Sequence, residues 1–147
     1  INAYGMEPPD ETVAEIAART RRPVMIGEFH FGSLDRGLPS TGLRGVASQN
    51  ERGIAYRRYV ERAAAHPDLI GVHYFILNDQ EVLGRFDGEN YQIGFVDVCH
   101  QPYRELVDSA TRAHRAVYEL MLGRAEPYRG KAREIPRVGR LVVPPSP

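Results

Sequence analysis

The sequence alternates short apolar segments with longer amphipathic ones, and this alternation restricts the fold more than any other feature. Residues 24–31 begin with an unbroken apolar run, as strands do when helices cover both of their faces. Residues 69–77 form a second segment of this kind. Helical spacing of apolar side chains predicts helices over residues 10–20, 50–65 and 106–121. Helices placed between buried strands indicate βαβ crossovers and an α/β fold with a parallel sheet.

Long loops follow both predicted strands. Residues 32–49 and 81–102 are each roughly 18 to 22 residues long, whereas connections between a strand and a helix usually have about 2 to 6. Barrels of the (β/α)8 type build their sites from loops at this end of the strands. The sequence therefore predicts the last part of a (β/α)8 TIM barrel, with a small open sheet as the alternative.

The ends of the sequence have a different character. Residues 1–5 read as the end of a strand entering a loop, and Asp10 is expected to cap the first helix. We predict two regions: residues 1–126 as the C-terminal part of a barrel domain, and residues 127–147 as a Pro- and Arg-rich tail without regular structure.

Composition excludes several classes of protein. With 42% hydrophobic and 26% charged residues, the 147-residue chain is typical of globular rather than disordered proteins. Nineteen basic residues balance nineteen acidic ones, so nothing favours nucleic-acid binding. Cys99 is the only cysteine, which excludes an internal disulfide and a cysteine-based zinc site. No apolar run approaches the roughly 20 residues of a membrane span.

Glu28 is the first candidate for chemistry, because it ends an otherwise apolar strand. Its desolvation is costly unless the carboxylate is paired or used. It alternates with His30, so both side chains should point to the same side. A structural role, such as capping the strand or pairing with an arginine, is the alternative. Together with His73, these residues also raise a metal-site hypothesis, but their spacing is not specific. We expect no metal and no cofactor.

Polar and aromatic residues gather near the same predicted rim. Asn78, Asp79 and Gln80 end the second strand, where capping is the alternative to substrate contact. The segment 87–91 reads as a turn or as a substrate loop. Four aromatic residues are candidates for a sugar-binding surface, although a core position is the more frequent role for such residues: Tyr74, Phe75, Phe86 and Tyr91.

Many of these residues belong to longer motifs that resemble the β-agarases of glycoside hydrolase family 50. The resemblance runs in order through roughly residues 1–121. It depends mainly on the long loop motifs, which are more specific than a single catalytic residue. The matching segments are residues 23–32, 34–37, 41–43, 50–53, 55–56, 71–75, 79–80, 84–91, 93–94, 102–103 and 105–106.

This resemblance implies a retaining (β/α)8 glycosidase, with the chain running from about the end of strand six to helix eight. Glu28 would be the nucleophile at the end of strand seven, and the acid/base glutamate would lie upstream of Ile1. The chain alone is therefore expected to be inactive. The implied substrate is a galactose-containing polysaccharide or oligosaccharide such as agarose. The implied substrate-binding residues are Tyr4, His30, Asp35, Arg36, His73, Tyr74, Gln80, Glu89 and Asn90.

Two departures from the family affect the choice of polysaccharide. Tyr74 stands where the family usually has tryptophan, and Glu81-Val82 replaces a segment of the Pro-Leu type. The resemblance is compatible with a secreted or periplasmic bacterial enzyme, while the sequence indicates neither compartment nor oligomeric state. Three alternatives remain open: a β-galactosidase of the same clan, a non-catalytic carbohydrate-binding remnant, and a metal-dependent hydrolase using His30 and His73.

Overall fold

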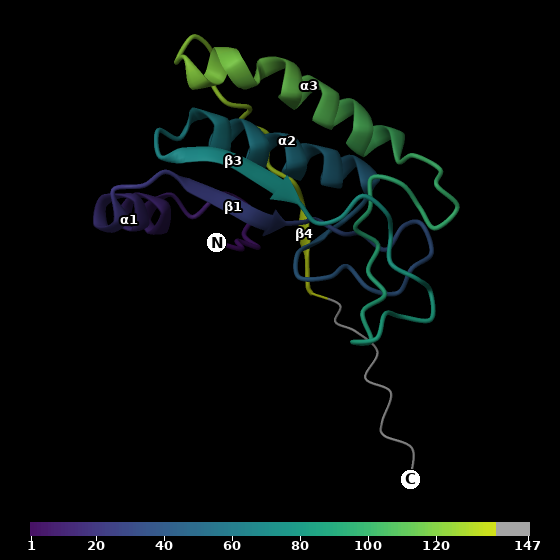
Figure 1. The fold of residues 1–147 in the computed structure, drawn as a ribbon. Helices are drawn as coiled ribbons and strands as arrows, with labels where there is room; N and C mark the ends of the chain where they lie inside the picture. Colours follow the sequence, from purple (N-terminus) through teal and green to yellow (C-terminus); the bar gives the residue numbers. More distant parts are fainter. Residues whose placement is uncertain (138–147) are drawn as a thin grey trace.

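Two parallel strands lie at the centre of the computed structural model, which describes residues 1–137. β1 (Val24–Phe29) pairs with β3 (Leu69–Tyr74), and both strands point towards the long loops (Figure 1). The N-terminal residues also pair with β1, because Asn2 forms a parallel bridge to Glu28. The predicted α/β arrangement with a parallel sheet is thus confirmed for these segments.

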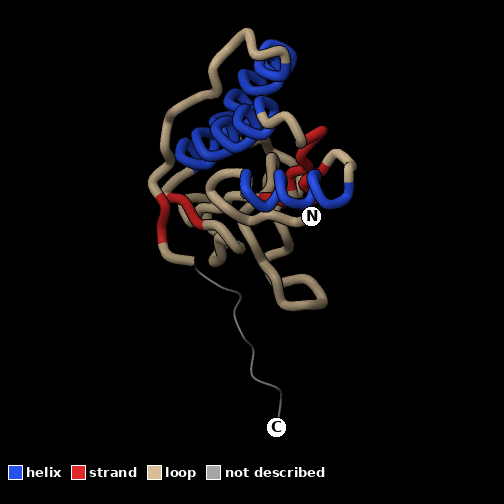
Figure 2. Tube along the Cα trace, turned by 90° about the vertical axis from the view of Figure 1, so that its left-hand side faces the viewer, coloured by secondary structure: helices blue, strands red, loops and turns tan. Residues whose placement is uncertain are grey.

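Helices cover one side of this sheet. α2 (Gln49–Ala65) packs next to the strands and α3 (Arg104–Met121) packs on α2, while α1 (Asp10–Thr20) lies beside β1 (Figures 1 and 2). Ser48 caps α2 by accepting a hydrogen bond from the Glu51 amide at 3.3 Å. None of the helices within residues 1–137 combines the length and the apolar character that crossing a bilayer requires.

The core lies between the sheet and α2. Phe29 of β1 stacks on Tyr59 of α2, with ring centroids 4.1 Å apart and planes 3° from parallel. Ile26 and Val13 are fully buried beside this pair, and Ala113 of α3 is equally buried. The apolar positions expected from the helical spacing therefore form one continuous core.

Three details of the predicted elements are wrong. Asp10 is the first residue of α1 rather than its cap, and its carboxylate pairs with Arg62 at 2.6 Å. β3 ends three residues earlier than predicted, because the Leu77 carbonyl binds the amides of Phe95 and Val96 instead of continuing along β1. Helices do not cover both sheet faces either. On the open face Met25 is 43% exposed and lies next to Gly71 of β3.

The predicted tail without regular structure is also wrong for its described part. β4 (Glu134–Ile135) pairs antiparallel with β2 (Gly45–Val46). We call residues 127–135 the strap, because they run along α2 (Figure 1). The strap is held by non-local acceptors on that helix, which no local pattern could indicate. Residues 138–147 lie outside the described part of the chain.

Candidate active site

Glu28 is half-buried at the carboxyl end of β1. The pairing with β3 is irregular between Ile26 and Phe29, and such an irregularity redirects side chains at the end of a strand. The Glu28 carboxylate accepts a hydrogen bond from the Tyr4 hydroxyl through Oε2. Burial, followed by the hydrogen bond to Glu28, raises the pKa of Tyr4, so this phenol stays protonated and remains a donor. None of the ion pairs found within residues 1–137 involves Glu28.

His30 lies on the same side as Glu28, as expected, because both contact Tyr4. Its ring centroid is 4.8 Å from that of Tyr4, and the side chain is 1% exposed. The Leu43 amide donates to Nε2 at 2.8 Å, which leaves the proton on Nδ1. Burial, and secondarily the charge of Arg52, lowers the pKa of His30 to about 3, while the Phe75 backbone opposes this shift. His30 is therefore neutral.

The loop after β3 brings further polar groups to this place. Gln80 donates to Glu89 Oε2 at 2.8 Å and accepts from the Tyr91 amide at 2.8 Å. The charge of Glu89 adds to the raised pKa of Tyr4. Asn90 is 4% exposed, and its Oδ1 has no hydrogen-bond partner among residues 1–137. The structure thus brings Gln80, Glu89 and Asn90 together within the single loop that follows β3.

Arg52 organises the loops after β1 and β3 and was missed by the sequence analysis. This α2 side chain is fully buried and lies 5.3 Å from the centroid of the Tyr103 ring. It lies in an ordinary polar helical stretch, and only its place in the 50–53 motif shared with the β-agarases distinguishes it from surface arginines. Its guanidinium donates to four acceptors: Phe31 O at 2.8 Å, Gln49 Oε1 at 2.6 Å, Tyr74 OH at 3.2 Å and Gly94 O at 2.6 Å.

No protein-family model matches the chain, but individual proteins do. Beta-agarase B from Vibrio sp. (strain JT0107) is 42% identical over 104 residues, covering 70% of this chain and 11% of the relative. Beta-agarase A from the same strain is 39% identical over 98 residues, covering 66% and 10%. The solved structure of an exo-β-agarase superposes with a TM-score of 0.78 at 40% identity, covering 83% of this chain and 16% of that one.

The chain is homologous to the β-agarases of glycoside hydrolase family 50. These homologues are glycosidases, and the expected family resemblance is confirmed. The chain spans only about a tenth of the length of the two curated β-agarases.

The resemblance to the β-agarases implies Asp35, Arg36 and Tyr74 as substrate-binding residues. In the structure, the polar atoms of all three bind other groups of the protein. Asp35 accepts from Ser33 Oγ at 2.7 Å and from the Gln49 amide at 2.9 Å, so it anchors the start of α2. Burial raises the pKa of Asp35, but these hydrogen bonds outweigh it and the net shift is downward. Arg36 forms an ion pair with Glu105 of α3 at 2.9 Å. Both residues therefore have structural contacts, and their place in the sugar subsites stays a prediction.

Tyr74 of β3 is the third, and its role as a substrate-binding residue likewise stays a prediction. Its hydroxyl donates to Phe31 O at 3.0 Å and accepts from Arg52, while its ring packs edge-on against Phe29. It therefore faces α2. His73, the residue before Tyr74, is exposed. It lies opposite the part of β1 where the pairing with β3 is irregular. Because successive side chains of a strand alternate, His73 lies on the uncovered face.

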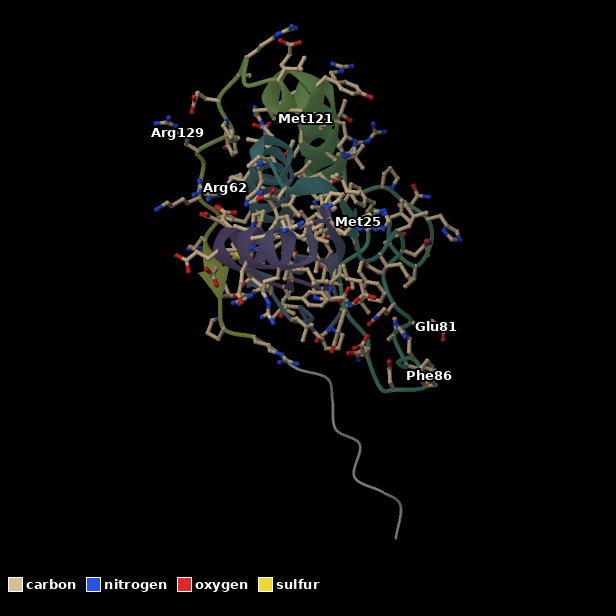
Figure 3. The ribbon with its side chains drawn as sticks, turned by 60° about the vertical axis from the view of Figure 1, so that its left-hand side comes forward. Met25, Arg62, Glu81, Phe86, Met121 and Arg129 are labelled. Atoms are coloured by element: carbon tan, nitrogen blue, oxygen red, sulfur yellow. The ribbon has the colours of Figure 1, made fainter. Side chains whose placement is uncertain are left out.

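Other expectations for the rim have mixed outcomes. Asp79 has a structural role rather than a free carboxylate. It accepts hydrogen bonds from Tyr103 OH at 2.5 Å and from the Gly94 amide at 2.7 Å. Tyr91 is buried as expected, but Phe86 is 96% exposed at the tip of its loop (Figure 3). No three His, Cys, Asp or Glu side chains within residues 1–137 are arranged to hold a metal ion.

Proposed function

We propose that this chain carries the nucleophile of a retaining glycosidase that cleaves β-galactosidic linkages in an agarose-type polysaccharide. The observation that carries the proposal is the half-buried Glu28 carboxylate at a strand end, hydrogen-bonded to Tyr4. In a retaining mechanism this carboxylate attacks the anomeric carbon, and a second carboxyl group about 5 to 5.5 Å away protonates the leaving oxygen. Water then hydrolyses the glycosyl-enzyme with help from the second group.

The neighbours of Glu28 suit the role of a nucleophile. Tyr4 donates to one carboxylate oxygen and so fixes its orientation. His30 is held neutral and contacts Tyr4, so it adds no positive charge that would weaken the attack. Gln80, Glu89 and Asn90 supply polar groups that can recognise sugar hydroxyls.

The second carboxyl group is assigned to a part of the enzyme outside residues 1–137. Glu89 is the described alternative on a rim loop, but the Gln80 amide and Arg85, 3.6 Å away, already hold its carboxylate. A general acid must instead carry a proton near neutral pH. The open sheet face at Met25 fits a (β/α)8 barrel in which the described strands are strands six to eight. The isolated chain should therefore not release reducing sugar from agarose.

The test uses a chimera of β-agarase B in which this chain replaces its homologous segment. Glu28→Gln should lower agarose hydrolysis on the order of a thousandfold or more, because the attacking oxygen is lost. Glu81→Gln, on an exposed loop carboxylate, is the matched control and should retain activity. A 2-deoxy-2-fluoro galactoside should label the peptide that contains Glu28.

Three outcomes would contradict the proposal. Activity in the Glu28→Gln chimera would exclude the nucleophile role. Hydrolysis of a chromogenic galactoside but not of agarose would favour the β-galactosidase alternative. Binding of agarose oligosaccharides without hydrolysis in the unmutated chimera would favour a non-catalytic carbohydrate-binding role.

A further inference from the structure

We infer that the strap, residues 127–135, is a positioning segment that holds the 41–46 loop against Tyr4 and His30. Its role in the site depends on the proposed function of Glu28. The strap runs along α2 and ends in β4, which pairs with β2, so an effect on the site would pass through the loop that contains β2 (Figure 1).

The strap is fixed to α2 through its own backbone. The Tyr128 amide donates to Glu61 Oε2 at 2.7 Å, and the Arg133 amide donates to Glu51 Oε2 at 2.6 Å. Glu61 is 2% exposed and also pairs with Arg57 at 2.6 Å. Buried carboxylates that accept backbone N–H groups form strong, directional hydrogen bonds. The strap therefore has a defined position rather than a loose one.

From α2 the strap continues to the loop. The Ala47 amide donates to Arg133 O at 3.0 Å, and β4 pairs with β2 directly beyond this point. The Gly32 amide donates to Arg44 O at 2.8 Å, and the Val46 amide donates to Gly32 O at 2.8 Å. β2 is thus bound on one side by the strap and on the other by the segment that follows β1.

The loop in turn holds two residues of the site. The Leu43 amide donates to His30 Nε2 at 2.8 Å, and Arg44 Nε donates to the Tyr4 carbonyl. Gly42 lies so close that a Cβ on it would approach His30 Nε2 to 2.6 Å. A shift of the 41–46 loop would therefore change the position of His30 and Tyr4, and Tyr4 is the residue bound to Glu28.

The test compares two substitutions at one exposed strap position. Arg133→Pro removes the amide that donates to Glu51, whereas Arg133→Ala retains it and loses only an exposed side chain. In the full chain, Arg133→Pro should increase hydrogen exchange of the Leu43 amide on the order of tenfold or more, and Arg133→Ala should not. Imidazole NMR should then show His30 titrating closer to its ordinary pKa of about 6.5 in Arg133→Pro only.

The amide of Ala113 in α3 serves as the internal reference, because a local effect leaves it protected. If Arg133→Pro exposes the Ala47 amide while Leu43 and His30 behave as in the unmutated chain, the positioning role is wrong. Should Arg133→Pro unfold the chain, native-state hydrogen exchange of the unmutated chain decides the question. The hydrogen bonds of the Arg133, Ala47 and Leu43 amides should then open in one step, so that the exchange rates of all three amides depend on denaturant concentration in the same way. Different dependences for the three amides would refute the inference. Because these measurements do not involve hydrolysis, they can fail independently of the proposed function.

Discussion

His30 is neutral because of its surroundings rather than its intrinsic chemistry. Burial removes water that would stabilise a positive ring, and the charge of Arg52 adds to the effect. The Leu43 amide occupies Nε2, so the ring presents Nδ1–H on its other side. A histidine in this state can donate a hydrogen bond but cannot act as a cation beside Glu28.

This neutrality predicts a dependence of stability on pH. The pKa of His30 falls from 6.5 to about 3 on folding, so between these values the unfolded chain binds a proton that the folded chain does not. The free energy of unfolding should therefore decrease as pH falls below about 6.5, by up to about 1.4 kcal/mol per pH unit. Urea unfolding between about pH 5 and 7 measures this slope before most carboxylates titrate.

The slope can be assigned with two histidine variants. His30→Gln, whose amide oxygen can still accept from Leu43, should lose most of the slope. His73→Gln removes an exposed histidine and should keep it. Equal slopes in the two variants would show that His30 titrates normally.

At the scale of elements, the close packing of α2 on α3 depends on Gly53. A Cβ at this position would lie 2.6 Å from the Glu105 carbonyl oxygen and 2.5 Å from Ser109 Oγ. One of these contacts is with backbone, which cannot move without displacing α3. The helices can therefore approach this closely only because residue 53 lacks a side chain.

Gly53→Ala should consequently destabilise the chain by about 1–3 kcal/mol through overpacking. Helix propensity alone predicts the opposite sign, a gain of about 1 kcal/mol, so the sign of the change distinguishes the two effects. Thermal and urea unfolding measure the difference. Gly71→Ala is the matched control in β3, because its Cβ would meet only the Met25 sulfur, at 3.9 Å.

The elements differ in how well the sequence predicts them. The helix at 50–65 is predicted to within one residue, because the helical spacing of its apolar side chains is a local signal. The strand at 69–77 is too long in the prediction, since pairing of Leu77 with a distant loop ends it. The strap depends on Glu51 and Glu61, more than 60 residues earlier in the sequence, and no nearby pattern encodes these partners.

In the candidate site, too, the sequence predicts local geometry but not contacts between residues that are far apart in the chain. Strand alternation correctly places Glu28 and His30 on one side, and the family resemblance correctly places Tyr4 beside them. The resemblance includes Arg52 in the 50–53 segment but did not show that the hydroxyl of Tyr74 turns towards it, because the two residues are brought together only by the packing of α2 on β3.

For the molecule as a whole, one face of the sheet formed by β1 and β3 is uncovered. On this face Met25 is 43% exposed, and Gly71 of β3 lies beside it. Exposed apolar groups on a sheet with unpaired backbone attract other chains. In the proposed (β/α)8 barrel, the remaining strands would cover this face.

The purified chain should therefore self-associate as its concentration rises. Met25→Lys should shift the molecular mass measured by light scattering towards the monomer, because a lysine on this face opposes pairing. Leu83→Lys is the matched control: this residue is 98% exposed but lies on the loop tip away from the sheet. If both variants reduce association equally, general solubility rather than the sheet face is responsible.

The single guanidinium of Arg52 connects loops that belong to different strands. It binds the carbonyl of Phe31 after β1 and that of Gly94 after β3. Exchanging either loop for that of a homologous β-agarase would move an acceptor and leave the other loop with a misplaced partner. Loop transplantation on this scaffold should therefore transfer both loops together with the helical segment around Arg52.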